Sequence, residues 1–223
     1  MSTLTGDDIL RRTRTTPELA DWQPLLGTIR ARYATPDFAA GLAFVAAVGE
    51  AAEAVDHHPD VVLSYTFVEV RLTSHDVGAL TERDVALATT IARIAADRGL
   101  AADRSVVQMM EVGLDTPDWR EIKPFWSALY GVDPDADPEA AEVVDPAGLL
   151  PPLWFQDTDP HDEPRQRFHL DLTIPPHALT SRVAAAVAAG GRVVDDGPSP
   201  RFVVLADRQG NRACLCTQVG RAR

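Results

Sequence analysis

Cysteine is scarce in this sequence: its 223 residues contain two, Cys214 and Cys216. Two cysteines exclude a disulfide framework of the kind that supports small secreted domains. Residues two apart on a strand point to the same face, and such neighbours are poorly placed to bridge each other. We therefore expect both cysteines to be reduced, buried and small hydrophobic side chains, as in a cytoplasmic protein.

Positive charge is also in short supply. Lysine and arginine number 21 against 33 aspartates and glutamates, so the net charge is −12. A surface that binds nucleic acid needs clustered basic residues, because it must neutralise phosphates. The balance therefore argues against a nucleic-acid partner, while it leaves open a neutral or cationic small molecule.

Long hydrophobic runs are absent as well. No apolar stretch reaches the roughly 20 residues that a membrane span needs. The N-terminus, MSTLTGDDILRRT, lacks the apolar core and cleavage site of a secretory signal. With 45% hydrophobic and 24% charged residues, the sequence predicts a soluble globular protein of the cytoplasm without a membrane partner.

Periodic patterns in the first hundred residues predict a compact α+β unit. Strict alternation over residues 67–73 is typical of a strand with one solvated face. Thr35 and Pro36 favour the start of a helix, and Thr81 to Asp84 resembles a capping box at the start of a second helix. We expect a domain over residues 1–102, with an antiparallel sheet and two helices on one face. Its expected strands are 28–33, 61–65 and 67–73, and its expected helices are 35–57 and 81–99.

The second half repeats one order of elements, which predicts a domain over residues 103–223 built from paired βαβββ modules. A loop or insertion rich in Pro, Asp, Glu and Ala separates the first helix from the later strands. The expected strands are 106–114, 142–144, 153–156, 167–174, 192–194, 202–206 and 213–217, with a turn at 208–211, and the expected helices are 116–130 and 178–189.

Three of the six histidines fall between residues 53 and 84 together with acids and a phenol. Imidazoles change charge near neutral pH, so such a cluster is suited to proton transfer. Helix and strand ends can bring its members to one rim of a sheet. The cluster consists of Glu53, His57, His58, Pro59, Tyr65, His75 and Asp84.

Each member also has a plainer interpretation. Asp84 can cap its helix, and Glu53 with His57 can form an ordinary surface pair four residues apart. Tyr65 is of a type that packs more often than it binds ligands, and His75 can be a loop histidine. The spacing lacks His-x-His and His-x-x-x-His, so it is a weak metal signal and we predict no metal there.

The joint spacing resembles the signature of the pterin-4a-carbinolamine dehydratases, also called 4a-hydroxytetrahydrobiopterin dehydratases. The resemblance extends over about residues 4–100 and includes the segment around Trp22. It implies a hydro-lyase that removes water from a 4a-hydroxytetrahydropterin to give the quinonoid dihydropterin, as in tetrahydrobiopterin recycling. No metal or redox cofactor is implied, since the pterin is the substrate.

The resemblance also implies roles for the cluster. His57 and His75 would be the acid and the base, with the individual assignment open, and His58 would position the pterin. Asp84 would orient His75 and stabilise its cationic form. The pocket would be shaped by Glu53, Pro59 and Tyr65.

Residues 105–217 resemble the glyoxalase-like, vicinal-oxygen-chelate domains, through Arg167 to Leu172 and through Asp207, Gly210 and Asn211. Such domains usually hold a divalent metal with His, Gln and Glu ligands. His169 occupies a ligand-like place, Gln108 and Gln156 are further candidates, and Cys214 stands where Glu is common. The missing carboxylate puts a metal in doubt, and His169 can equally be a packed strand histidine.

Two other functions compete with the dehydratase. One is a metal-dependent enzyme or small-molecule-binding protein centred on the C-terminal domain, and the other is a non-catalytic binding or dimerisation protein. Both resemblances are to proteins that commonly pair, so a homo-oligomer, either a dimer or a tetramer, is expected.

Overall fold

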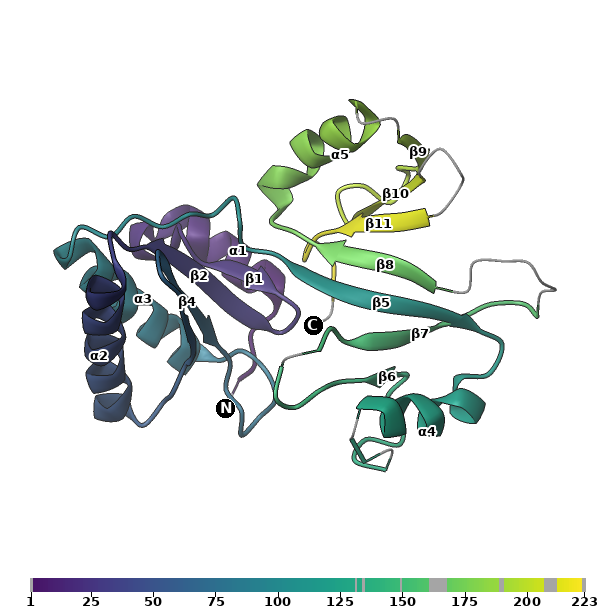
Figure 1. The fold of residues 1–223 in the computed structure, drawn as a ribbon, viewed down its shortest axis with the longest axis horizontal. Coiled ribbons are helices and arrows are strands. Elements are labelled where there is room, and N and C mark those ends of the chain that lie inside the picture. The colour runs from purple at the N-terminus through teal and green to yellow at the C-terminus, as the bar shows by residue number, and fades with distance from the viewer. Residues whose placement is uncertain are drawn as a thin grey trace. The chain divides into compact units, whose positions relative to one another are not determined.

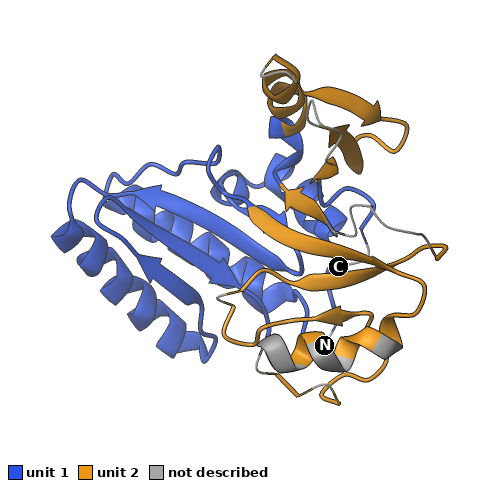
Figure 2. Cartoon of the chain, turned by 45° about the vertical axis from the view of Figure 1, so that its right-hand side comes forward, with its two compact units in different colours: residues 1–108, 174–178, 217–223 blue, residues 109–173, 179–216 orange. Residues whose placement is uncertain are grey.

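The computed structural model describes residues 2–130, 132–133, 135–148, 150–160, 168–188, 191–206 and 212–221. The chain divides into two compact units (Figure 2). Unit 1 consists of residues 1–108, 174–178 and 217–223, and unit 2 of residues 109–173 and 179–216. The expected domain boundary between residues 102 and 103 stays a prediction. The two units are defined by contacts, and residues 174–178 and 217–223 belong to unit 1 although they lie far along the chain.

Unit 1 contains a four-stranded antiparallel sheet in the order β1-β2-β4-β3, with three α-helices (Figure 1). The strands are β1 (Gln23–Leu25), β2 (Thr28–Ala34), β3 (Asp60–Leu63) and β4 (Phe67–Leu72), and the helices are α1 (Gly6–Thr15), the short η1 (Pro17–Leu19), α2 (Phe38–Val55) and α3 (Glu82–Asp97).

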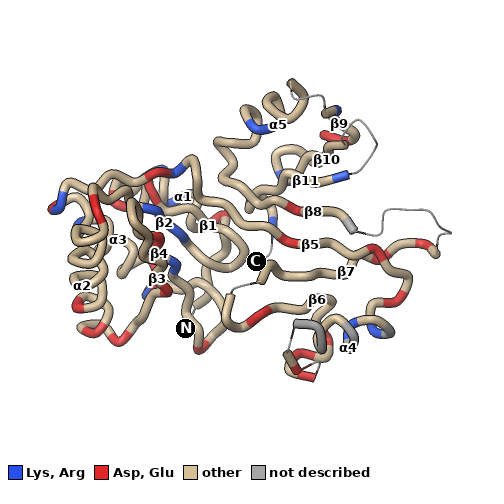
Figure 3. The backbone as a smooth tube through the Cα atoms, in the orientation of Figure 1, with Lys and Arg blue, Asp and Glu red and all other residues tan. Residues whose placement is uncertain are grey.

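The two faces of this sheet differ as the alternation predicts. In β4 the apolar Val68 and Val70 are fully buried, while Glu69 between them lies on the other face. There Glu69 accepts hydrogen bonds from Arg32 of β2, with Nε 2.9 Å away. Figure 3 shows acidic and basic positions close together along these strands. The helices therefore cover one face, and a network of ion pairs occupies the opposite one.

Helices α2 and α3 each contribute buried side chains to the core over the apolar face of the sheet. Phe44, Val48 and Ala52 of α2 are at most 1% exposed and belong to the same core cluster as Ile91 of α3. Among the described residues α2 is the one helix long and apolar enough to match a membrane span, with 22% of its window buried. A helix in a protein core can meet the same criteria of length and hydropathy, and α2 packs on the sheet.

Unit 2 contains a seven-stranded mixed sheet in the order β6-β7-β5-β8-β11-β10-β9. The strands are β5 (Met109–Thr116), β6 (Glu142–Val143), β7 (Leu153–Asp157), β8 (Phe168–Thr173), β9 (Arg192–Asp195), β10 (Phe202–Ala206) and β11 (Arg212–Cys216), and the helices are α4 (Trp119–Tyr130) and α5 (Leu179–Ala188). A further short helix, η2 (Pro176–Ala178), lies in the segment assigned to unit 1.

Two modules related by their strand pairing build this sheet. In the first, β5 pairs in parallel with β7, and in the second β8 pairs in parallel with β11. The antiparallel pairing of β5 with β8 joins the modules at the centre. The expected α+β class, with an antiparallel N-terminal sheet and a paired C-terminal module, is confirmed.

The first module has three strands among the described residues, and the second has four. The chain between α4 and β6 is rich in proline and aspartate, and proline has no N–H to donate to a strand ladder. Lys123 of α4 holds this segment, because its Nζ donates to the carbonyl of Ala140 at 2.7 Å. The expected turn at 208–211, Asp207 and Arg167 lie outside the described residues.

Candidate functional site

His57 sits directly after the end of α2. Asp56 caps the helix in a left-handed conformation, with φ 48° and ψ 46°, and this turns the chain away from the helix axis. The backbone N–H of His57 still donates to the carbonyl of Ala52 at 3.2 Å. The imidazole is therefore directed into the unit instead of along the helix surface, and its side chain is 6% exposed.

The imidazole of His57 meets the carboxylate of Asp84 on α3. His57 Nε2 lies 2.8 Å from Asp84 Oδ1, and the side chain of Asp84 is fully buried. The other oxygen, Oδ2, accepts from the backbone N–H of Thr81 at 2.7 Å and from the hydroxyl of Ser74 at 2.8 Å. Both carboxylate oxygens are thus bonded, as burial of such a group requires.

This arrangement fixes the chemistry of the imidazole. An ionised carboxylate can only accept, so His57 Nε2 donates the hydrogen bond to Asp84 Oδ1. Nδ1 is the ring nitrogen that Asp84 does not bind. The geometry is that of a histidine held in one tautomer by a buried carboxylate, which is a common arrangement for general acid–base catalysis.

His58, next in the chain, is exposed. Its Nε2 lies 3.1 Å from Glu53 Oε1, and the two side chains are 53% and 78% exposed. A pair so open to solvent contributes little to stability. His58 follows His57 in the chain, so the exposed pair of His58 and Glu53 lies at the border of the buried site. Pro59, the next residue, is half-buried.

His75 follows Ser74, the residue whose hydroxyl is bonded to Asp84. The loop between β4 and α3 closes through a bridge of Ser74 with Ala79, and His75 is exposed on it. The carboxylate of Asp84 therefore links the chain at His57 with the chain beside His75. Tyr65 lies in the β3–β4 turn, where it is 69% exposed.

The observed pairings differ from those that the sequence suggested. The resemblance implied that Asp84 orients His75, and the structure bonds Asp84 to His57. The plainer interpretation paired Glu53 with His57 on one helix face, and the structure pairs Glu53 with His58. The cause of the second difference is the left-handed Asp56, because it ends α2 at Val55 and removes His57 from the helical periodicity.

The plainer interpretation of Asp84, as the residue that caps its helix, is confirmed. Thr81 and Asp84 form the predicted capping box, and the same carboxylate uses its second oxygen for His57. The sequence did not point to Ser74 as a member of the site. Its place directly before His75 is the one signal that a small hydrogen-bond donor could lie near the cluster.

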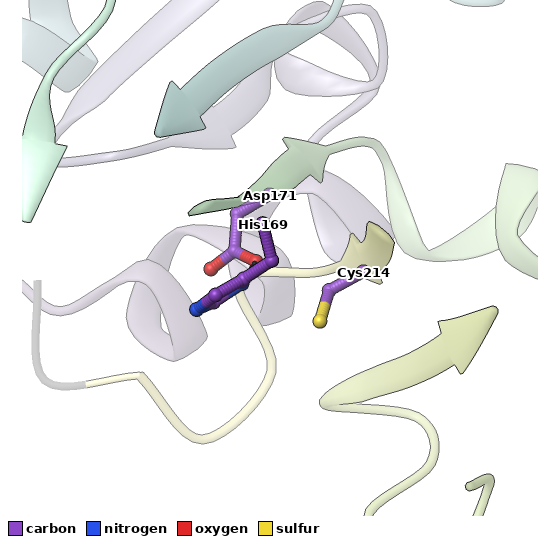
Figure 4. Close-up of side chains that lie close together, drawn as sticks. All are labelled: His169, Asp171 and Cys214. Carbon is purple, nitrogen blue, oxygen red and sulfur yellow. Dashed lines mark hydrogen bonds and ion pairs between the residues drawn. The ribbon is translucent and has the colours of Figure 1, made fainter. Parts of the chain in front are cut away.

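A second cluster lies in unit 2, around His169 of β8. His169 Nδ1 is 3.2 Å from Asp171 Oδ1, and Nε2 is 3.5 Å from Asp115 Oδ1. The donor atoms of His169, Asp171 and Cys214 all lie within 4.8 Å of one another (Figure 4). Trp154 packs edge-on against the imidazole, with ring centroids 5.3 Å apart.

Strand register explains why these residues meet. Cys214 of β11 is opposite Asp171 of β8, and Gly113 of β5 is opposite His169. A Cβ on Gly113 would lie 2.5 Å from the His169 ring, so the glycine leaves the space that the imidazole fills. Cys214 is half-buried, which corrects the expectation that both cysteines are buried apolar side chains.

The two groups shift each other's protonation. The hydrogen bond to Asp171, followed by that to Cys214, raises the pKa of His169 to about 10. The hydrogen bond from Cys216, and then that from His169, lowers the pKa of Cys214 to about 6. Between these values the imidazole is cationic and the sulfur anionic.

The donor set differs from the His, Gln and Glu set that a glyoxalase-like fold implies. His169, Asp171 and Cys214 each offer one ligand atom, and these three residues could hold a metal ion. Gln156 donates its amide to the neighbouring carbonyl of Asp157 at 3.2 Å. Gln108 directly precedes β5.

Comparisons with known proteins match the two parts of the chain separately. Residues 2–94 match the sequence profile described as Pterin 4 alpha carbinolamine dehydratase, and residues 111–216 match one described as a glyoxalase-like domain. Both family expectations from the sequence are confirmed.

Relatives with the provisional name pterin-4-alpha-carbinolamine dehydratase match the first part. One from Picosynechococcus sp. is 41% identical over 73 residues, which are 33% of this chain and 79% of the relative. One from Thermomicrobium roseum is 38% identical over 78 residues, covering 35% and 84%. A solved structure titled transcriptional coactivator/pterin dehydratase from Brucella melitensis is 28% identical with a TM-score of 0.39, covering 42% of this chain and 99% of that one.

Identity near 40% over most of a relative's length places the N-terminal part in one family, and the second profile accounts for the C-terminal part. The chain belongs to the pterin-4-alpha-carbinolamine dehydratase family and carries a glyoxalase-like domain after its dehydratase-like part.

Proposed function

We propose that unit 1 is a hydro-lyase that dehydrates a 4a-hydroxytetrahydropterin of the tetrahydrobiopterin type to the quinonoid dihydropterin. The observation that carries the proposal is the buried pair of His57 and Asp84, held by Ser74, at the border where His58 and His75 are exposed. Membership of the dehydratase family supports the same reaction.

The reaction needs one proton removed and one delivered. The C4a hydroxyl leaves as water only when it is protonated, and a proton leaves the ring nitrogen N5. We assign the base to His57 through Nδ1, because Asp84 holds Nε2 and stabilises the positive charge that develops when Nδ1 takes a proton. The assignment follows the observed pairing, which differs from the expected one.

His75 then delivers the proton to the leaving hydroxyl. It is exposed on a loop that Ser74 ties to Asp84, so a bound pterin can reach it. His58, with Glu53, positions the pterin and polarises the hydroxyl, and Pro59 and Tyr65 shape the border of the pocket. No step in this sequence uses a metal or a redox cofactor.

We propose further that the protein works in the cytoplasm as a homo-oligomer. Cys214 and Cys216 are free thiols, which favours a reducing compartment. The exposed Phe38 and Leu42 of α2, 49% and 54% exposed, favour association of copies. Sedimentation of the purified chain tests the oligomer, since a single monomer mass would contradict it.

The reaction is tested with the full chain and a 4a-hydroxytetrahydropterin in a stopped-flow assay. We expect His75→Ala to lower turnover by about tenfold or more, since a positioned acid contributes at least that much. His177→Ala is the matched control, because His177 is an exposed histidine outside the cluster. Unchanged turnover in folded His75→Ala protein would refute the role of His75.

A metal-dependent activity of the C-terminal domain is the alternative. The cluster of His169, Asp171 and Cys214 supports this alternative, because these three residues could hold a metal ion, although the set lacks the Glu that is common in such domains. The metal content of the purified protein separates the two functions, because a stoichiometric divalent metal that depends on His169 would favour the alternative.

A further inference from the structure

Lys123 is the only lysine of the chain, and it is buried on α4, where it is 6% exposed. It lines a cavity of about 460 Å³ together with Ser127, which lies one helical turn later on the same face. That volume is within the range of roughly 300–1,000 Å³ that small-molecule sites occupy. We propose that this cavity binds an aliphatic α-amino acid, whose carboxylate meets Lys123 and Ser127 and whose ammonium meets the carboxylates that line the same cavity.

The first support is the hydroxyl of Ser127. This residue is 1% exposed, and among the described residues its Oγ has no hydrogen-bond partner. Serine inside a helix can donate to the carbonyl four residues earlier, which satisfies the hydroxyl locally. A buried hydroxyl that lacks such a bond calls for a partner from outside the chain, since the large majority of buried polar groups are paired. A carboxylate oxygen in the cavity supplies that partner.

The second support is the ammonium of Lys123. Its Nζ donates to the backbone carbonyls of Asp137 and Ala140, the latter at 2.7 Å. An ammonium has three protons, so one remains beyond these two bonds. Both carbonyls are neutral, as is the Trp119 ring whose centroid lies 5.4 Å from Nζ. A ligand carboxylate therefore adds a charged partner to a buried cation, which favours its binding.

The third support is the charge around the cavity. Asp133, Asp137 and Glu142 line it as well, and Figure 3 shows acidic positions on β6 and on the loop beside α4. Asp133 and Asp137 are exposed, whereas Glu142 is half-buried. These carboxylates repel a simple anion, while a simple cation leaves Lys123 and Ser127 without an acceptor. A zwitterion satisfies both sets of groups.

The apolar part of the lining selects the side chain of the ligand. Val132, Val143, Val144 and Pro146 contribute to it. Aliphatic walls favour an aliphatic ligand, because their contact removes apolar area from water. A branched amino acid such as leucine therefore fits by size and by polarity. All of these residues belong to unit 2, so the proposal does not rest on the dehydratase assignment of unit 1.

The primary test uses the single lysine as a reporter. In the full chain labelled with ¹⁵N-lysine, Lys123 gives the only labelled backbone amide signal, because the chain has no other lysine. We expect L-leucine to shift this signal until it saturates, with a Kd of about 1 mM or lower. The absence of a shift in folded protein would overturn the proposal, because the cavity would then hold only water.

Two truncated ligands separate the two ends of leucine. 4-Methylpentanoate keeps the carboxylate and the aliphatic body without the ammonium, and 3-methylbutylamine keeps the ammonium and the body without the carboxylate. We expect each to bind at least about tenfold more weakly than L-leucine, since each leaves one set of charged groups without its partner. If 3-methylbutylamine bound as tightly as L-leucine, general attraction to acidic residues would explain the binding and the carboxylate site would be refuted.

Variants test the individual residues while Lys123 continues to hold its segment. Ser127→Ala should weaken the binding of L-leucine by about tenfold, because a hydrogen bond to a charged group is lost. Glu142→Gln should weaken the binding of L-leucine but not that of 4-methylpentanoate, because only leucine carries an ammonium. Ser181→Ala on α5 is the matched control, since Ser181 is an exposed helical serine. Unchanged affinity in folded Ser127→Ala protein would contradict the proposed site.

Discussion

Each unit pairs a histidine with a buried aspartate, and the two pairs are built differently. In unit 1, Asp84 binds one nitrogen of His57 and leaves the other free, while donors from Ser74 and Thr81 occupy its second oxygen. In unit 2, carboxylates face both nitrogens of His169, and a sulfur lies beside them. The first arrangement suits an imidazole that exchanges protons, and the second suits one that stays charged.

The comparison teaches that the partners of an imidazole decide its use. One carboxylate fixes the tautomer and stabilises a transient charge. In unit 2 the hydrogen bond to Asp171, followed by that to Cys214, raises the pKa of His169 to about 10 and favours the cationic form. Removing a carboxylate from each unit should therefore damage different steps.

Asp84→Asn should have the largest effect. The Asn amide can donate as well as accept a hydrogen bond, so it no longer fixes the tautomer of His57. We expect the rate of dehydration to fall by about 100-fold or more. The free energy of unfolding should fall by about 2 kcal/mol, because buried donors lose an anionic acceptor. Turnover and urea denaturation measure the two effects. Asp171→Asn, the counterpart in unit 2, should leave turnover near that of the wild type, and an equal loss in both variants would break the comparison.

Gly113→Ala should disturb unit 2 alone. The added Cβ would lie 2.5 Å from the His169 ring, so the imidazole must move, at a cost of about 1–3 kcal/mol in unfolding free energy. The pH midpoint of Cys214 alkylation by iodoacetamide should rise, because the hydrogen bond to His169 that lowers the pKa of Cys214 is weakened. Gly49→Ala on α2 is the matched control, because nothing lies within 4 Å of its added Cβ. An unchanged midpoint in Gly113→Ala would show that the ring position does not govern the thiol.

Ser74→Ala should give a smaller change in unit 1. It removes one of the donors to Asp84 Oδ2 and leaves the backbone N–H of Thr81 in place. We expect a loss of about 1 kcal/mol in unfolding free energy and a decrease in turnover of several-fold, with the KM for the pterin little changed. A loss as large as that of Asp84→Asn would mean that Ser74 contacts the substrate.

Chelator should have the smallest effect. Proton transfer between imidazoles and the pterin needs no metal, so prolonged treatment with EDTA should leave dehydration unchanged. A loss of turnover that added zinc restores would contradict the proposed mechanism.

The sequence predicts the members of the first site but not their pairing. The spacing of His57, His75 and Asp84 indicated that helix and strand ends gather them, and the capping box at Thr81 was expected and is present. The left-handed conformation of Asp56 decides which histidine meets Asp84. A non-glycine residue with positive φ has no reliable local signal, so this pairing needed the structure.

Most elements of the second half could also be predicted, since their periodicity is local. The neighbourhood of His169 could not, because it depends on register between strands distant in sequence. Asp171 lies opposite Cys214, and Gly113 opposite His169, only after β5, β8 and β11 are aligned. A shift of one residue would turn Cys214 to the other face.

The most direct test of the central claim is the rate at which the full chain dehydrates a 4a-hydroxytetrahydropterin, compared in a stopped-flow assay with the spontaneous reaction. We expect the wild-type chain to accelerate dehydration by at least about 100-fold, the contribution of one positioned acid or base. A rate equal to the spontaneous one, from protein shown to be folded, would contradict the assignment of unit 1 as a dehydratase.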